Sequence, residues 1–84
     1  KIWEQLAPLF PQFKYNTSDC RFLGAPIDYV IFNHYTEVKE GAQASIEIVF
    51  MDVKTGDSQL TPSQKVIKKA VENGRVRWET LRLK

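Results

Sequence analysis

The chain has 84 residues, of which 43% are hydrophobic, and its formal net charge is +2. A chain of this length forms one small domain that buries roughly 60 to 65% of the surface its unfolded form exposes. The single cysteine, Cys20, excludes an internal disulfide and a cysteine-built zinc site, and it fits a reducing cytoplasm. The longest purely apolar run, Ile48 to Met51, is far too short to span a membrane, so this segment is expected to make no membrane contact.

The first half of the chain is expected to contain a short helix and two strands. Apolar residues at helical spacing predict a helix within residues 2–10, which prolines at positions 8 and 11 limit. We expect residues 1–84 to form one domain. Because the chain starts inside this helix, we also expect it to be a fragment of a longer protein. Strands are expected at Arg21 to Leu23 and at Ile27 to Phe32, where branched and aromatic side chains predominate.

The strongest strand signal lies at Ser45 to Lys54. Its middle is apolar on both faces, which is typical of a central strand that is covered on both sides. The preceding segment, Thr36 to Ala44, is polar and contains a glycine, so it is expected to be a loop that joins two neighbouring strands as a hairpin.

A second helix has an unusually complete start signal. Thr61 is its expected N-cap, Pro62 its first residue and Gln64 the partner in a capping box, while Asn73-Gly74 ends it in a left-handed turn. A final strand is expected at Arg75 to Leu83, with a bulge or a frayed end where the alternation shifts phase. The order helix, three strands, helix, strand (αβββαβ) predicts an α/β fold with a mixed central sheet flanked by helices.

Charge is distributed unevenly along the chain. Residues 1–53 contain four basic and seven acidic residues, whereas residues 54–84 contain eight basic and three acidic ones. Carboxylates that hold a cation beside a basic surface that docks a phosphate backbone would give this pattern, although ordinary surface charge gives it too. The candidates for contacting phosphates are Arg21, Lys65, Lys68 and Lys69. For the three lysines a solvated helix face is the first explanation and phosphate contact the second, whereas Arg21 fits either.

Three residues are the strongest candidates for chemistry. Asp52 and Lys54 lie two positions apart at the end of an apolar strand, so their side chains project from the same face. Asp28 opens the preceding strand, and a hairpin in a suitable register would bring its carboxylate near Asp52. Two carboxylates suit Mg²⁺ or Mn²⁺, and the lysine can orient a water molecule, accept its proton or offset phosphate charge during phosphodiester hydrolysis. The alternative is a salt bridge at a strand end.

The motif Pro26-Ile27-Asp28 followed by Asp52-Val53-Lys54 resembles the PD-(D/E)xK nucleases, although Ile27 separates the proline from the aspartate and Asp52 replaces the more common glutamate. The stretches RFLGAPIDYVIF, DVKTGDSQLTPSQ and GRVRWETLRL are similar to predicted endonucleases distantly related to archaeal Holliday junction resolvases. This resemblance implies a restriction-endonuclease-like core and metal-dependent cleavage of DNA, including branched DNA, where paired cuts call for a homodimer.

The same resemblance implies two further site residues. Glu4 in WEQLAP would complete the metal site, and Gln64 would support catalysis, although its place in a capping box explains it nearly as well. A second match to the short motif, Glu37-Val38-Lys39, follows no apolar strand and is interpreted as a decoy. Two other functional classes stay open, a nucleic-acid-binding module that has lost catalysis and a structural assembly domain.

Overall fold

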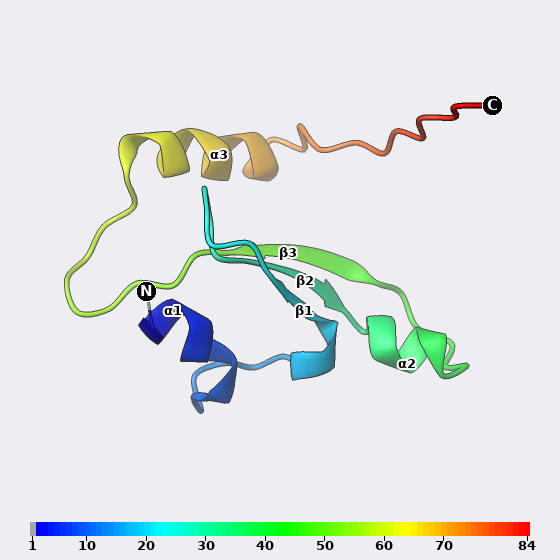
Figure 1. Cartoon of the computed structure of the whole chain (residues 1–84), viewed down its shortest axis with the longest axis horizontal. Coiled ribbons are helices and arrows are strands. Elements are labelled where there is room, and N and C mark those ends of the chain that lie inside the picture. Colours follow the sequence, from blue (N-terminus) through cyan, green and yellow to red (C-terminus); the bar gives the residue numbers. More distant parts are fainter. Residues whose placement is uncertain (1) are drawn as a thin grey trace.

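The computed structural model describes residues 2–84 and places a three-stranded antiparallel sheet between helices on its two faces (Figure 1). None of the helices in this part of the chain is long and apolar enough to cross a membrane. The elements in chain order are α1 (Ile2–Leu6), the 3₁₀ helices η1 (Ala7–Leu9) and η2 (Thr17–Asp19), β1 (Cys20–Phe22), β2 (Tyr29–Asn33), α2 (Tyr35–Lys39), β3 (Glu47–Met51) and α3 (Pro62–Glu72).

The sheet is a meander with strand order β1-β2-β3, and both pairings are antiparallel. Cys20 lies opposite Ile31 in the first pairing, and Tyr29 lies opposite Met51 in the second. The prediction of a mixed α/β protein is confirmed at the level of helices and strands, but the described sheet is not mixed because it has no parallel strand. The expectation that β3 is a central strand is also wrong, since β3 lies at an edge.

The core occupies one face of the sheet. Tyr29 and Ile31 of β2 pack with Ala7 of η1, and several partly buried side chains surround them, namely Phe13, Tyr15, Cys20, Val49, Met51 and Val53. Side chains alternate between the faces of a strand, so Ile48 and Phe50 of β3 point to the other face, where both are exposed. Figure 1 shows α3 lying over that second face, and no residue of α3 is buried.

Helix α3 confirms the predicted start and end signals. The Thr61 hydroxyl accepts a hydrogen bond from the Gln64 backbone N–H at 3.2 Å, and the Gln64 side-chain oxygen accepts one from the Thr61 N–H at 3.1 Å. Asn73 is the C-cap, and Gly74 follows with a φ of +70°, which glycine adopts without a steric penalty. Local sequence alone therefore determines where this helix begins and ends.

Helix α2 corrects the prediction of a loop at Thr36 to Ala44. The first backbone N–H groups of a helix have no hydrogen-bond acceptors within the helix. In α2 a side chain distant in the sequence accepts these hydrogen bonds. The Asp19 carboxylate accepts hydrogen bonds from the His34 N–H at 3.1 Å, the Thr36 N–H at 2.7 Å and the Thr36 hydroxyl at 2.7 Å. Asp19 is only 1% exposed, so these bonds replace those that it would make to water.

The predicted final strand is the other correction. Residues 75–84 form no strand or helix, and Figure 1 shows them running away from the sheet beyond the end of α3. An alternating pattern makes a segment suitable for a sheet, but a strand exists only where its backbone groups pair with a neighbour.

The contacts of Asp19 predict a pH-dependent contribution to stability. The pKa of its carboxyl lies below the ordinary value of 3.8 because of the Thr36 hydroxyl, opposed by burial, and because of the Thr36 and His34 N–H groups. A carboxyl with a lower pKa in the folded state stabilises the fold at pH values above its unfolded-state pKa. This stabilisation disappears as the pH falls through the folded-state pKa. Asp19→Asn should therefore lower the urea midpoint at neutral pH and flatten its decline below about pH 4.

The matched control is Asp57→Asn, which changes an exposed aspartate in the loop before α3. Equal urea midpoints for wild type and Asp19→Asn at neutral pH would contradict the role given to Asp19.

Candidate active site at the end of the sheet

Asp28 and Asp52 are the residues next to the last pair of the β2–β3 ladder, Tyr29 and Met51, so they lie across from each other. The Asp28 backbone N–H donates to the Met51 carbonyl at 3.1 Å, and an Asp28 carboxylate oxygen accepts from the Val53 N–H at 2.8 Å. Asp28 is 5% exposed. Hydrogen bonds to backbone groups thus fix the Asp28 carboxylate and the segment from Met51 to Val53 that carries Asp52.

Lys54 lies against Asp52. Its Nζ is 2.6 Å from Oδ2 of Asp52, and the Asp52 side chain is 10% exposed. This oxygen is buried and accepts no hydrogen bond of good geometry, so the short contact is an attraction between charges. The buried Oδ2 of Asp52 therefore has the Lys54 ammonium as its charged partner.

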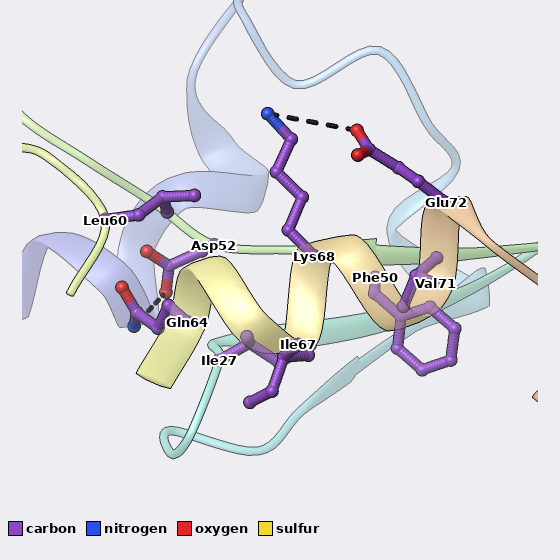
Figure 2. Close-up of a pocket in the computed structure, with 9 residues that line it drawn as sticks. All are labelled: Ile27, Phe50, Asp52, Leu60, Gln64, Ile67, Lys68, Val71 and Glu72. Carbon is purple, nitrogen blue, oxygen red and sulfur yellow. Dashed lines mark hydrogen bonds and ion pairs between the residues drawn. The ribbon is translucent and has the colours of Figure 1, made fainter. Parts of the chain in front are cut away.

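Gln64 connects α3 to the two strand ends. Its side-chain nitrogen donates to the Pro26 carbonyl at 2.9 Å and to Oδ1 of Asp52 at 3.3 Å, as the dashed line in Figure 2 shows for Asp52. Its oxygen completes the capping box with Thr61. The capping role and the site role, which are alternatives in the sequence, therefore coexist because the amide has a donor end and an acceptor end.

Glu4 reaches the site from α1, which Tyr29 anchors. The Tyr29 hydroxyl donates a hydrogen bond to the backbone carbonyl of Glu4. In a continuous helix that carbonyl would accept from the residue four positions later, which is Pro8 and has no N–H. The buried tyrosine thus supplies a donor that the sequence of α1 lacks.

These side chains meet in one open pocket of about 280 Å³, lined by Glu4, Gly24, Asp28, Asp52, Lys54 and Gln64. The structure therefore brings together all the residues that the sequence marks as catalytic or metal-binding candidates. Two features of the site were not predicted from the sequence: Gly24, which lines the pocket, and the Pro26 carbonyl, which accepts a hydrogen bond from Gln64. The sequence signal for Gly24 is a glycine directly after a short strand, where a φ of +87° is needed.

The pocket concentrates negative charge around Asp28. Burial raises the pKa of this carboxyl above its ordinary value, the Val53 N–H opposes that rise, and the neighbouring Asp52 and Glu4 carboxyls add to it. Among residues 2–84, the pocket lining contains three carboxyl groups and one basic side chain, that of Lys54. A cation placed between the carboxyl groups would offset their excess negative charge.

The donor set fits a hard divalent cation. Carboxylate oxygens are the ligands that Mg²⁺ and Mn²⁺ prefer, and both Asp28 and Asp52 line the pocket. Within residues 2–84, no group of three His, Cys, Asp or Glu side chains could hold a metal ion. Water and substrate oxygens would therefore have to complete the coordination, as is usual for Mg²⁺.

The candidate phosphate-binding residues lie outside the pocket. Lys65, Lys68 and Lys69 are exposed on α3, and Lys68 is 3.9 Å from Glu72, an exposed pair of little energetic weight. Arg21 lies on β1, at the other edge of the sheet from β3, and its guanidinium donates to two nearby backbone carbonyls. The structure does not group Arg21 with the three lysines.

The second match to the short motif lies at the opposite end of the sheet. Glu37 and Lys39 belong to α2, which follows the end of β2, whereas Asp28 precedes its start. Glu37 pairs with His34 at 3.0 Å, and this contact is exposed. The two residues therefore provide matched controls for Asp52 and Lys54.

Loss of the Tyr29 hydroxyl should release α1. Tyr29→Phe keeps the buried ring but removes the hydroxyl that donates to the Glu4 carbonyl, so the free energy of unfolding should fall by about 1 kcal/mol. Urea denaturation measures this change, with Tyr35→Phe as the matched control. An unchanged midpoint for Tyr29→Phe would show that the hydroxyl does not hold α1.

The sequence matches one family model over residues 1–83, that of the endonucleases related to archaeal Holliday junction resolvases. No curated protein and no solved structure matches the chain. The family match includes the first helix, both strand ends and α3, which are the elements that line the pocket. The chain therefore belongs to the family of endonucleases related to archaeal Holliday junction resolvases.

Proposed function

We propose that this chain is a metal-dependent endonuclease that hydrolyses DNA phosphodiester bonds, with four-way junctions and other branched DNA among its substrates. One observation carries the proposal: Asp28, Asp52 and Lys54 converge from two adjacent strand ends in a single pocket. This convergence supports assignment of these residues as a PD-(D/E)xK site, and membership of an endonuclease family agrees with the proposal.

Asp28 and Asp52 are the proposed ligands of Mg²⁺ or Mn²⁺. Glu4 lines the same pocket but forms no three-residue metal group with them in this structure. When bound, the cation supplies charge neutralisation at the scissile phosphate and activation of the attacking water. The chain's own contribution is to hold the two carboxylates. The Val53 N–H fixes Asp28, and the Gln64 amide fixes Asp52.

Lys54 is the proposed catalytic cation of the chain itself. Its ammonium group lies at the Asp52 carboxylate and is partly exposed to the pocket. From there it can donate hydrogen bonds to a phosphate oxygen or orient a water molecule toward phosphorus. Both roles need a positive donor beside the carboxylates, which is what the spacing of two residues along an extended segment provides.

Helix α3 provides a route for the DNA backbone. Gln64 in its first turn contacts the site, and Lys65, Lys68 and Lys69 follow on the same helix with exposed side chains. Lysines contact phosphates without reading bases, so we propose that they position DNA rather than select its sequence.

Cleavage assays test the proposal with four variants. Wild type, Asp52→Asn and Lys54→Ala are incubated with Mg²⁺ or Mn²⁺ and with duplex, single-stranded and four-way junction DNA. The two site variants should lose at least about 100-fold in cleavage rate. Glu37→Gln and Lys39→Ala, which alter the second motif match, should cut like wild type.

Two results would contradict the nuclease. One is the absence of cleavage of all three substrates with either metal, and the other is wild-type cleavage by Lys54→Ala. Salt-dependent DNA binding without cleavage would instead favour a binding module that has lost catalysis.

A further inference from the structure

The free edge of β3 is suited to receive another strand. Within residues 2–84, β3 pairs with β2 alone, so the backbone groups along its other edge have no partner strand. Ile48 and Phe50 are exposed on the face that α3 only loosely covers, as is Ile46 just before the strand. Figure 2 shows Phe50 beneath Val71 of α3, at the side of a pocket of about 330 Å³. An open apolar edge of this kind invites pairing with another segment.

Residues 75–83 have the properties of a strand without a neighbour. The Arg77 guanidinium is 2.8 Å from the Glu79 carboxylate, and the Trp78 indole N–H donates to the Thr80 hydroxyl at 2.8 Å. Contacts between residues two apart require side chains to alternate between two faces, as they do in extended backbone. Large apolar side chains along this segment are exposed, namely Val76, Trp78 (88% exposed), Leu81 and Leu83.

The end of α3 directs this segment away from its own sheet. The Gly74 N–H donates to the Val71 carbonyl at 3.0 Å, and the Arg75 N–H donates to the Ala70 carbonyl at 2.9 Å. This closing turn, with Gly74 in the left-handed region, sets the direction in which the chain leaves the helix. Figure 1 shows the segment, coloured orange to red, continuing past the end of the sheet.

We propose that residues 75–83 of one copy pair with the free edge of β3 in a second copy, and that the exchange is reciprocal. The two copies then form a dimer in which each open edge receives the partner's strand. Val76 and Trp78 would cover Ile48 and Phe50 on one face. Regular alternation would place Leu81 and Leu83 on the opposite face of the added strand, which is the face that carries Val49 and Met51 in β3.

Charge complementarity favours a second copy as the partner. Residues 75–84 contain four basic residues and one acidic residue, whereas residues 35–51, which include β3 and α2, contain three acidic residues and one basic residue. Arg75 and Arg77 would share a face with Glu47 at the start of β3. The proposed pairing involves none of the residues that line the candidate catalytic pocket, so it is independent of whether the chain cuts DNA.

Sedimentation of the full-length chain tests the exchange. Wild type should be a dimer, and either Trp78→Asp or Ile48→Asp should raise the dimer dissociation constant about 30-fold or more, because each removes apolar contacts from the centre of both paired edges. Val66→Asp is the matched control, since Val66 is an exposed apolar residue on α3 away from the edge, and this variant should stay dimeric.

Mixing the two variants separates exchange from other modes of association. The Ile48→Asp chain keeps an intact C-terminal segment and the Trp78→Asp chain keeps an intact β3 edge, so the mixture should form a heterodimer through one complete pairing. Circular dichroism checks that each variant is folded. A monomeric wild type, or a mixture of folded variants that stays monomeric, would overturn the proposal.

Discussion

The pairing of β2 with β3 is the constraint on which the rest of this structure depends. Its last pair, Tyr29 with Met51, leaves Asp28 and Asp52 facing each other one residue beyond the ladder. A slip of one residue would send one of the aspartates to the face that carries the core. Beyond the last backbone pair, the Asp28 carboxylate accepts a hydrogen bond from the Val53 N–H. The same side chain therefore lies at the end of the sheet and lines the pocket.

Helix α3 is held by polar contacts at the ends of β2 and β3 more than by apolar packing. No residue of α3 is buried. The side of α3 that faces the sheet lines an open pocket and does not pack into a filled core. Gln64 provides the specific polar link, since its amide reaches the Pro26 carbonyl and Asp52. A site built in this way orients Asp52 through Gln64 and leaves the neighbouring apolar surface open, which is the surface that the proposed pairing with another copy would cover.

Features that depend on near neighbours in the sequence could be predicted, and those that depend on distant partners could not. The capping box of α3 and the common face of Asp52 and Lys54 follow from spacings of two or three residues. Helix α2 could not be predicted because its first N–H groups bind Asp19, fifteen or more residues away. The strand expected at Arg75 to Leu83 has the right alternation, but its existence depends on a partner edge, which no local pattern specifies.

The central claim is that Asp28 and Asp52 together hold one divalent cation. Crystals grown with Mn²⁺ test it directly, because the anomalous signal of the metal locates it independently of the protein atoms. We expect one peak within ligand distance, about 2.0 to 2.3 Å, of oxygens from both carboxylates, and its loss in Asp28→Asn. The absence of a peak between the two aspartates, or one that persists unchanged in Asp28→Asn, would contradict it.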